Sequence, residues 1–237
     1  MHIAIAVIIA ISALWVALAA FAIARLGIGF KQALLYVPFK LWYRISDRQI
    51  HVARNAPTPV IYAVWHQSRL DPALMLSLLP EDTLHILDEA SARSWWLDPW
   101  RGLGRCISFN ARHVFVSRRL VQRLKGGGRL AVYLPDDTSP DKRSFRLFRA
   151  IARIAMRADA QVVPIYVKGS EKTAFSLSGG SRLLPALSVR TLEPVTLETL
   201  KLRSQNGELR ASQALLNRML EARGIRIQEE ERVEEAA

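Results

Sequence analysis

The sequence predicts an α/β protein with a central, mostly parallel sheet flanked by helices and an N-terminal membrane-anchoring helix. Three observations lead to this prediction. Residues 3–24 are apolar apart from Ser12. From residue 60 onward, short apolar segments rich in β-branched residues alternate with longer amphipathic segments, which is the pattern of strands joined through helices. Half of the 237 residues are hydrophobic, enough to build one sizeable core.

Residues 1–27 form the predicted transmembrane anchor. About 20 apolar residues are needed for a helix to cross the hydrocarbon core of a bilayer. No basic region precedes the run, and it is longer than the core of a signal peptide, so we expect the mature chain to keep it. A buried core helix is the alternative. Basic residues follow the run, whereas only His2 precedes it, which predicts a cytoplasmic main body.

Residues 28–57 are predicted to form an interfacial helix followed by a polar linker. Aromatic side chains alternate with Lys and Arg over 26–45, as in helices that lie among lipid head groups. Pro38 is expected to kink or break this helix. A helix packed on the main domain is the alternative. The linker is assigned to residues 47–59, which are polar and include two prolines.

Residues 58–225 form the predicted main domain, and the acidic tail 226–237 is predicted to be disordered. Apolar and β-branched runs predict the strands, and amphipathic segments between turn residues predict the helices. The strands are expected at 60–65, 83–87, 106–109, 129–134, 162–167 and 187–192. The helices are expected at 72–79, 91–103, 116–125, 143–157 and 208–221.

The charge and cysteine content restrict the partners of the chain. The net charge is +12, and residues 228–237 contribute −4, so the rest of the chain carries +16. A body this basic suits nucleic acid, anionic head groups or phosphorylated substrates. Cys106 is the single cysteine, so no disulfide forms within the chain and thiolate zinc sites are excluded. No histidine pair has metal-ligand spacing, and we predict no metal.

The stretch around His66 contains the best candidates for catalysis. His66 ends the apolar run 60–65, and Asp71 follows just before Pro72. Ligands of open α/β sheets bind beyond the carboxyl ends of the strands. A loop that curls back after His66 brings the carboxylate of Asp71 to the imidazole. Asp71 also suits a helix cap, because proline is favoured at the first helical position.

Two further segments stand at or near strand ends. The loop after the strand at 129–134 contains Pro135, Asp136, Asp137 and Thr138, whose carboxylates and hydroxyl could hold a polyol or orient a phosphate-binding loop. The same composition is typical of an ordinary turn. Pro164 lies within the strand predicted at 162–167, which indicates an edge position or a bulge.

In this order, the three segments resemble the glycerophospholipid acyltransferase family, which includes lysophospholipid and 1-acylglycerol-3-phosphate acyltransferases. Residues 65–72 match its His-x4-Asp block, residues 134–138 resemble its Phe-Pro-Glu-Gly-Thr block, and residues 163–165 resemble its Val-Pro-Ile block. The stretches 167–176 and 187–194 are together most similar to bacterial lysophospholipid acyltransferases. The resemblance extends from about residue 58 to residue 195.

The resemblance implies an activity and a set of residue roles. A fatty acyl chain would pass from acyl carrier protein or CoA to a hydroxyl of a lysophospholipid or glycerol-phosphate acceptor, without a further cofactor, at a bacterial-type inner membrane. His66 would be the general base and Asp71 would orient it. Backbone amides near the His66 loop could stabilise the oxyanion. The implied substrate-binding residues are Ser68, Arg69, Arg112, Pro135, Asp136, Asp137, Thr138 and Pro164.

Departures from the family pattern leave alternatives. The family's Glu-Gly pair is replaced by Asp136 and Asp137, and aspartate adopts a positive φ less readily than glycine. A catalytically inactive, lipid-binding relative is therefore the main alternative. A membrane-tethered nucleic-acid binder has only the charge in its favour, and we expect no nucleic-acid partner. A hydrolase with Ser68 as nucleophile lacks the Gly-x-Ser-x-Gly turn. The sequence predicts no oligomeric state.

Overall fold

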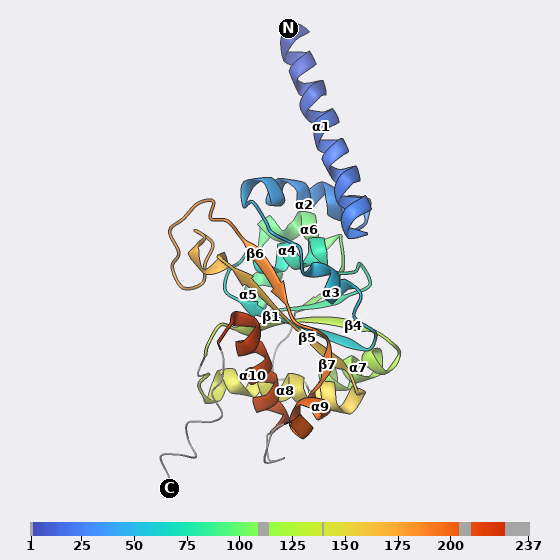
Figure 1. Cartoon of the computed structure of the whole chain (residues 1–237), viewed down its shortest axis with the longest axis vertical. Coiled ribbons are helices and arrows are strands. Elements are labelled where there is room, and N and C mark those ends of the chain that lie inside the picture. Colours follow the sequence, from blue (N-terminus) through green and yellow to red (C-terminus); the bar gives the residue numbers. More distant parts are fainter. Residues whose placement is uncertain (1, 109–113, 139, 204–209, 226–237) are drawn as a thin grey trace.

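A parallel sheet with two antiparallel additions forms the centre of the molecule (Figure 1). The computed structural model describes residues 2–108, 114–138, 140–203 and 210–225. Within these residues the strand order is β3-β2-β4-β1-β5-β6, and β7 also pairs with β5. Strands β1 to β5 run parallel, and β6 and β7 run antiparallel to β5, which confirms the predicted fold class. The strands are β1 (Val60–His66), β2 (Leu84–Leu87), β3 (Arg105–Ser108), β4 (Arg129–Pro135), β5 (Gln161–Lys168), β6 (Ser188–Thr191) and β7 (Val195–Thr196).

Strand β1 lies between β4 and β5, and the two cores on either side of the sheet bury both its faces. Tyr62 and Val64 belong to the core beneath α2 and α4, and the alternate residues Ile61 and Trp65 belong to the core beneath α8 and α10. The indole N–H of Trp65 donates to the carbonyl oxygen of Met219 in α10 at 2.8 Å. Burial on both faces explains why β1 reads as an unbroken apolar run.

Helices cover both faces of the sheet (Figure 1). Helices α2 and α4 pack on one face, and α7, α8 and α10 pack on the other. The segment predicted as one helix at 91–103 is divided into short pieces. A new helix begins at Asp98, with Pro99 in its first turn. The helices are α1 (His2–Leu26), α2 (Phe30–Trp42), α3 (Ile50–Arg54), α4 (Asp71–Leu78), α5 (Glu89–Ala92), α6 (Asp98–Arg101), α7 (Val114–Lys125), α8 (Lys142–Ala158), α9 (Leu197–Arg203) and α10 (Ala211–Arg223).

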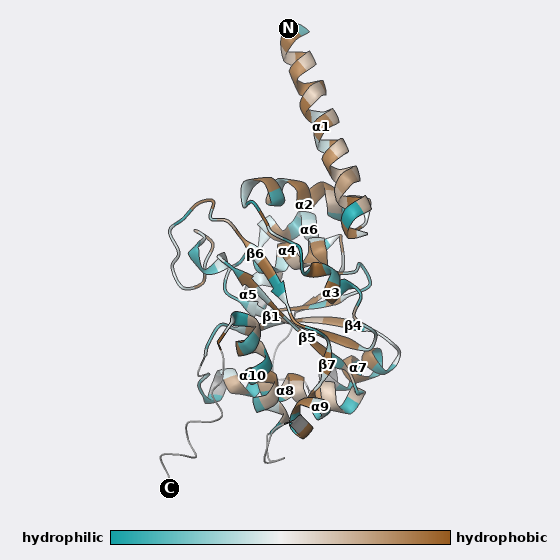
Figure 2. Ribbon diagram, in the orientation of Figure 1, coloured by the Kyte–Doolittle hydropathy of each residue, from teal (hydrophilic) through white to brown (hydrophobic). Residues whose placement is uncertain are grey.

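Helix α1 projects away from the rest of the molecule and is apolar along its length (Figures 1 and 2). Of its side chains only Ala19 and Ala22 are buried. By length and composition it is able to cross a membrane, and among the described helices it alone meets both criteria. The alternative of a buried core helix is wrong because the apolar side chains of α1 are exposed. Helix α1 is therefore a candidate membrane anchor.

Helix α2 has one face on the domain and one face exposed. The amide of Gln32 is buried and donates to the carbonyl oxygens of Leu76 and Leu79, at 2.9 and 2.8 Å. The side chains of Phe30 and Trp42 are exposed. One face of α2 is therefore packed on the main domain, as the alternative expected. The other face is exposed and has the composition of an interfacial helix. The helix continues through Pro38, so the possible break at this residue does not occur.

The polar segment at 47–59 is not a linker. It contains α3 and begins with Asp47, whose side chain is buried against α1 and α2. Asp47 accepts hydrogen bonds from Arg25, Tyr36 and Lys40. Burial alone would raise the pKa of Asp47, but the hydrogen bonds from Lys40 and Tyr36 and the two positive charges hold it below its ordinary value. The carboxylate therefore joins α1 and α2 to the domain.

The substitution Asp47→Asn tests this junction. It removes a buried charge with three partners and should lower the free energy of unfolding by about 2 kcal/mol. The loss is smaller than for a fully buried pair, because Lys40 and Arg25 are partly exposed and regain water. Chemical unfolding in detergent at pH 7 measures the loss. Asp82→Asn is the control, because Asp82 pairs with Arg129 at the surface, where a pair is worth at most about 1 kcal/mol. Equal losses in the two variants would contradict the assignment.

Candidate active site

The candidate site lies at the carboxyl ends of β1 and β4. His66 is the last residue of β1 and is paired in register with Pro135, the last residue of β4. Two loops therefore leave the sheet side by side, one after His66 and one after Pro135. This edge is where open α/β sheets place their ligands. The structure thus brings the first two sequence blocks together at one edge of the sheet.

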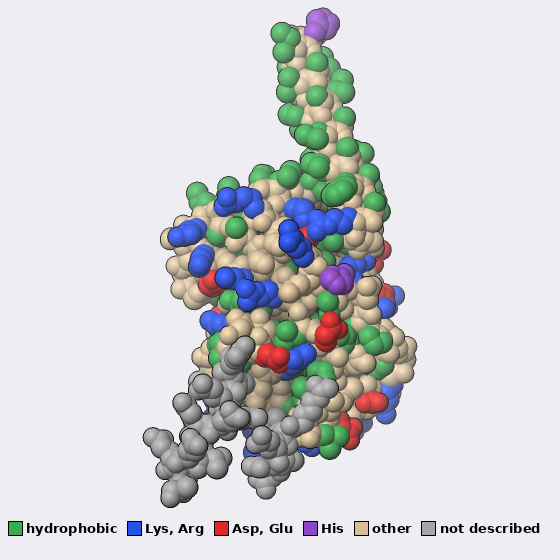
Figure 3. Space-filling model, in the orientation of Figure 1, with side chains coloured by type: hydrophobic (Ala, Val, Ile, Leu, Met, Phe, Trp, Pro, Cys, Tyr) green, Lys and Arg blue, Asp and Glu red, His purple; other side chains and the backbone are tan. Residues whose placement is uncertain are grey.

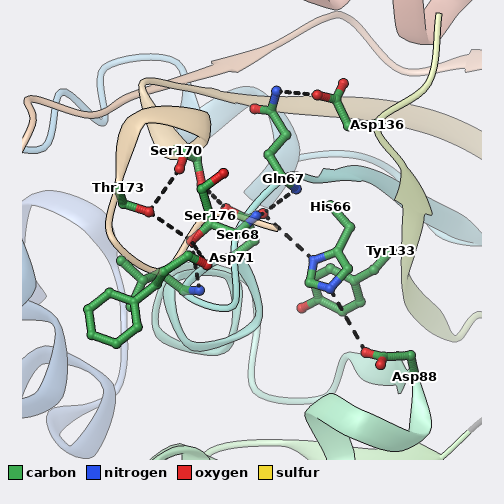
Figure 4. Close-up of polar contacts among 12 residues, drawn as sticks. His66, Gln67, Ser68, Asp71, Asp88, Tyr133, Asp136, Ser170, Thr173 and Ser176 are labelled. Atoms are coloured by element: carbon green, nitrogen blue, oxygen red, sulfur yellow. Dashed lines mark hydrogen bonds and ion pairs between the residues drawn. The ribbon is translucent and has the colours of Figure 1, made fainter. Parts of the chain in front are cut away.

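The loop after His66 folds around the carboxylate of Asp71 (Figure 4). Asp71 Oδ2 accepts hydrogen bonds from the backbone N–H groups of Gln67 and Ser68, both at 2.8 Å, and Oδ1 accepts one from the hydroxyl of Ser170. Oδ2 then lies 3.7 Å from Nδ1 of His66. Asp71 is 1% exposed, so this anion is fixed by protein groups and not by water.

Asp71 does not cap α4 through its side chain. It is the first residue of the helix, and Leu70 occupies the cap position without a side-chain hydrogen bond. The alternative role expected for Asp71 is therefore wrong, because both its oxygens are used by the loop and by Ser170. Ser170 follows β5, far along the sequence, and no local pattern marks it as a partner of Asp71.

The remaining residues of the first block support the loop. Ser68 is buried, and its hydroxyl contacts the hydroxyl of Thr173 and donates to the carbonyl oxygen of Phe175, both at 3.1 Å. Ser68 is therefore a structural residue in this structure and offers no exposed nucleophile. The side chain of Arg69 is exposed, and its backbone N–H donates to Phe175 at 3.0 Å.

The second block holds the end of α10. Asp136 accepts a hydrogen bond from the side-chain amide of Gln67 at 2.8 Å and pairs with Arg223 at 2.6 Å. Both acidic oxygens are therefore occupied by protein groups. Asp137 has no positive φ, so aspartate replaces the family's glycine here without backbone strain. Thr138 is exposed beside them.

Two of the predicted substrate-binding residues, Pro164 and Arg112, are not placed in the site by the structure. Pro164 is buried in β5 and pairs in register with Ala63, three residues before His66. By the alternation along β5 it shares the face of Val162, beneath α8 and α10, whereas His66 shares the face of Val64. The expected contribution of Pro164 to the site is therefore wrong. Its strand is not an edge, but β6 and β7 are interrupted opposite it. Arg112 lies outside the described residues.

Sequence patterns missed a buried pair beneath the imidazole. The ring of Tyr133 meets the ring of His66 edge-on at 5.7 Å, and its hydroxyl lies 3.0 Å from Nδ1 of His85. Burial lowers the pKa of His85 to about 3, so this imidazole is neutral, and burial also raises the pKa of Tyr133 well above its ordinary value. A neutral pair supports the His66 ring without adding charge.

Asp88 is a second residue that sequence patterns missed. It follows β2, and its Oδ1 lies 3.9 Å from Nε2 of His66 (Figure 4). The imidazole of His66 is 13% exposed, and its Nδ1 makes no hydrogen bond. An imidazole at the mouth of a strand with a buried carboxylate behind it is suited to removing a proton from a hydroxyl.

Comparison with known proteins identifies the class. The sequence matches the acyltransferase family over residues 47–168, and the chain belongs to this family. It is similar in fold to the crystal structure of the 1-acyl-sn-glycerophosphate acyltransferase PlsC from Thermotoga maritima. That similarity has a TM-score of 0.52 at 15% identity and covers 89% of each chain. The chain is therefore an acyltransferase, and the resemblance inferred from the three blocks is confirmed.

The neutrality of His85 predicts a loss of stability in acid. Because the pKa is about 3 in the folded protein and 6.5 ordinarily, the unfolded chain binds a proton that the folded chain does not between these values. Stability therefore falls as the pH is lowered from 6.5 toward 3. His85→Asn removes this dependence, so wild type should lose about 3 kcal/mol more than the variant between pH 7 and pH 4.

Chemical unfolding in detergent at the two pH values measures this difference. His51→Asn is the matched control, because His51 is exposed. This control should lose as much stability as wild type. If the free energy of unfolding of His85→Asn fell with pH as steeply as that of wild type, His85 would not be held neutral in the folded protein.

Proposed function

We propose that this enzyme transfers a fatty acyl group from an acyl thioester, on acyl carrier protein or CoA, to a free hydroxyl of a lysophospholipid or glycerol-phosphate acceptor. The observation on which the proposal depends is the His66 imidazole, with a buried carboxylate 3.7 Å from Nδ1. The family supports acyl transfer in general. The acceptor class follows the printed activity of the Thermotoga maritima protein and is a proposal for this chain.

The proposed reaction is direct transfer with His66 as general base. Nε2 takes the proton of the acceptor hydroxyl as the hydroxyl oxygen attacks the thioester carbonyl carbon. The tetrahedral intermediate then collapses, the C–S bond breaks, and the imidazolium returns the proton to the leaving thiolate. Asp71 faces Nδ1, so its negative charge favours the tautomer with Nε2 free and stabilises the imidazolium. A base in this role contributes about 10² to 10⁴ in rate.

The loop after His66 does not supply the oxyanion hole. The N–H groups of Gln67 and Ser68 donate to Asp71, that of Arg69 donates to Phe175, and that of Leu70 donates to the hydroxyl of Ser68. All four are occupied, so none of these four N–H groups is available to the oxyanion. Other donors must serve the tetrahedral intermediate.

The surface near α1 supports a membrane location for the reaction. Exposed Phe30, Leu41 and Trp42 lie on α2, beside the base of α1. Lys and Arg side chains gather on the part of the body that adjoins these helices (Figure 3). Apolar and aromatic groups bordered by cations suit an anionic bilayer surface. We propose that α1 anchors the chain in a bacterial-type inner membrane with the catalytic domain in the cytoplasm, where the lipid acceptor and the acyl thioester are both within reach.

The substitution His66→Ala tests the proposed function. Purified protein in detergent is supplied with a panel of lysolipids and with a labelled acyl chain carried on acyl carrier protein or on CoA. Transfer of the labelled chain to each lysolipid is then measured. His66→Ala should lower kcat by about 10² to 10⁴, because the base is lost. His51→Ala should retain full activity, because His51 is an exposed residue of α3.

The outcomes separate the proposed enzyme from its alternative. Equal activity of wild type and His66→Ala would reject the mechanism. Lysolipid binding by wild type with no turnover of either donor would instead support an inactive lipid-binding relative.

A further inference from the structure

Asp88 places a second carboxylate against the imidazole of His66 (Figure 4). Its Oδ1 lies 3.9 Å from Nε2, whereas Oδ2 of Asp71 lies 3.7 Å from Nδ1 on the other side of the ring. The two carboxylates differ in environment, because the Asp88 side chain is 52% exposed and that of Asp71 is 1% exposed. The ring therefore lies between a buried anion and a solvent-facing anion, and the second faces the nitrogen assigned as the base.

A helix cap explains only one oxygen of Asp88. Oδ2 accepts a hydrogen bond from the backbone N–H of Ser91 at 3.3 Å, and the carbonyl oxygen accepts one from Ala92 at 2.9 Å, so Asp88 caps the start of α5. Oδ1 takes no part in this cap. It is the oxygen that faces His66. Its contact with the imidazole is thus additional to the local role.

The distance defines the kind of interaction. A separation of 3.9 Å is too long for a hydrogen bond, so Asp88 and His66 interact through charge. Nε2 therefore keeps its lone pair for the acceptor hydroxyl. Among the described residues, the other titratable groups in contact with the ring are Asp71 from α4 and Tyr133 from β4, and the hydroxyl of Tyr133 is engaged by neutral His85.

We propose that Asp88 is a positioning residue for acyl transfer, which orients the imidazole of His66 and stabilises the imidazolium that forms when Nε2 takes the hydroxyl proton. The proposal rests on His66 being the general base. The positive charge appears on the ring only while the proton is held there, before it passes to the leaving thiolate. A carboxylate on each side of the ring then favours the charged form more than Asp71 alone does.

Asparagine and serine at position 88 separate the charge from the cap. Both residues cap helices as well as aspartate does, but neither is charged. Asp88→Asn and Asp88→Ser should therefore keep α5 and lower kcat/KM by about tenfold. Asp88→Glu restores the charge and should recover most of the activity.

The pH profile of kcat/KM is the readout that a merely structural role would not change. Without the charge of Asp88 the imidazolium is less stable, so the unprotonated base persists to lower pH. The acid limb of the profile should therefore move down by about 0.5 to 1 pH unit in Asp88→Asn. Asp98→Asn is the control, because Asp98 is also an exposed carboxylate at the start of a short helix and pairs with Arg101. Its profile should match that of wild type.

The outcomes are distinct from those for the proposed function. An unmoved acid limb in Asp88→Asn, with or without a slower rate, overturns the role of Asp88 and leaves His66 as base. Full activity in His66→Ala overturns the proposed function itself. A shifted limb with recovery in Asp88→Glu supports the proposal.

Discussion

The buried carboxylate of Asp71 is the group on which the rest of the site depends. It closes the loop after β1 through two backbone hydrogen bonds and takes a third from Ser170, which follows β5. One side chain thereby connects the end of the central strand, the start of α4 and the segment after the neighbouring strand. Because it is dry and fully bonded, it holds its position toward His66 without depending on solvent. Local folding and proposed catalysis thus share one anion.

The hydrogen bonds to Asp71 also restrict what the loop after His66 can bind. The amides that curl toward Asp71 are no longer free to bind a developing oxyanion, so the geometry that fixes the base excludes the nearest donors. The block at Asp136 is likewise engaged, since its carboxylate connects Gln67 to Arg223 in α10. Residues of the two sequence blocks therefore hydrogen-bond to each other, and these bonds make a site on two loops rigid.

Sequence patterns predict the elements of this protein better than the contacts between them. Strand β1 was predictable because burial on both faces leaves an apolar run, and His66 and Asp71 were predictable because both belong to one loop. Ser170 and Asp88 approach the same site from other strands, and only the sheet order brings them together. Asp47 looked like part of a polar linker because its partners belong to other elements, and Arg25 on α1 is 22 residues away. The face of Pro164 likewise depends on register.

The contacts of Asp47 also determine how the body is attached to α1, the candidate membrane anchor. A domain on a free tether samples many heights above a bilayer, but Arg25 in the last turn of α1 is bonded to Asp47 in the body. With α1 placed across a bilayer as proposed, anchor and body would tilt together. The height of His66 above the bilayer would then be set by the fold and by how α1 matches the bilayer thickness.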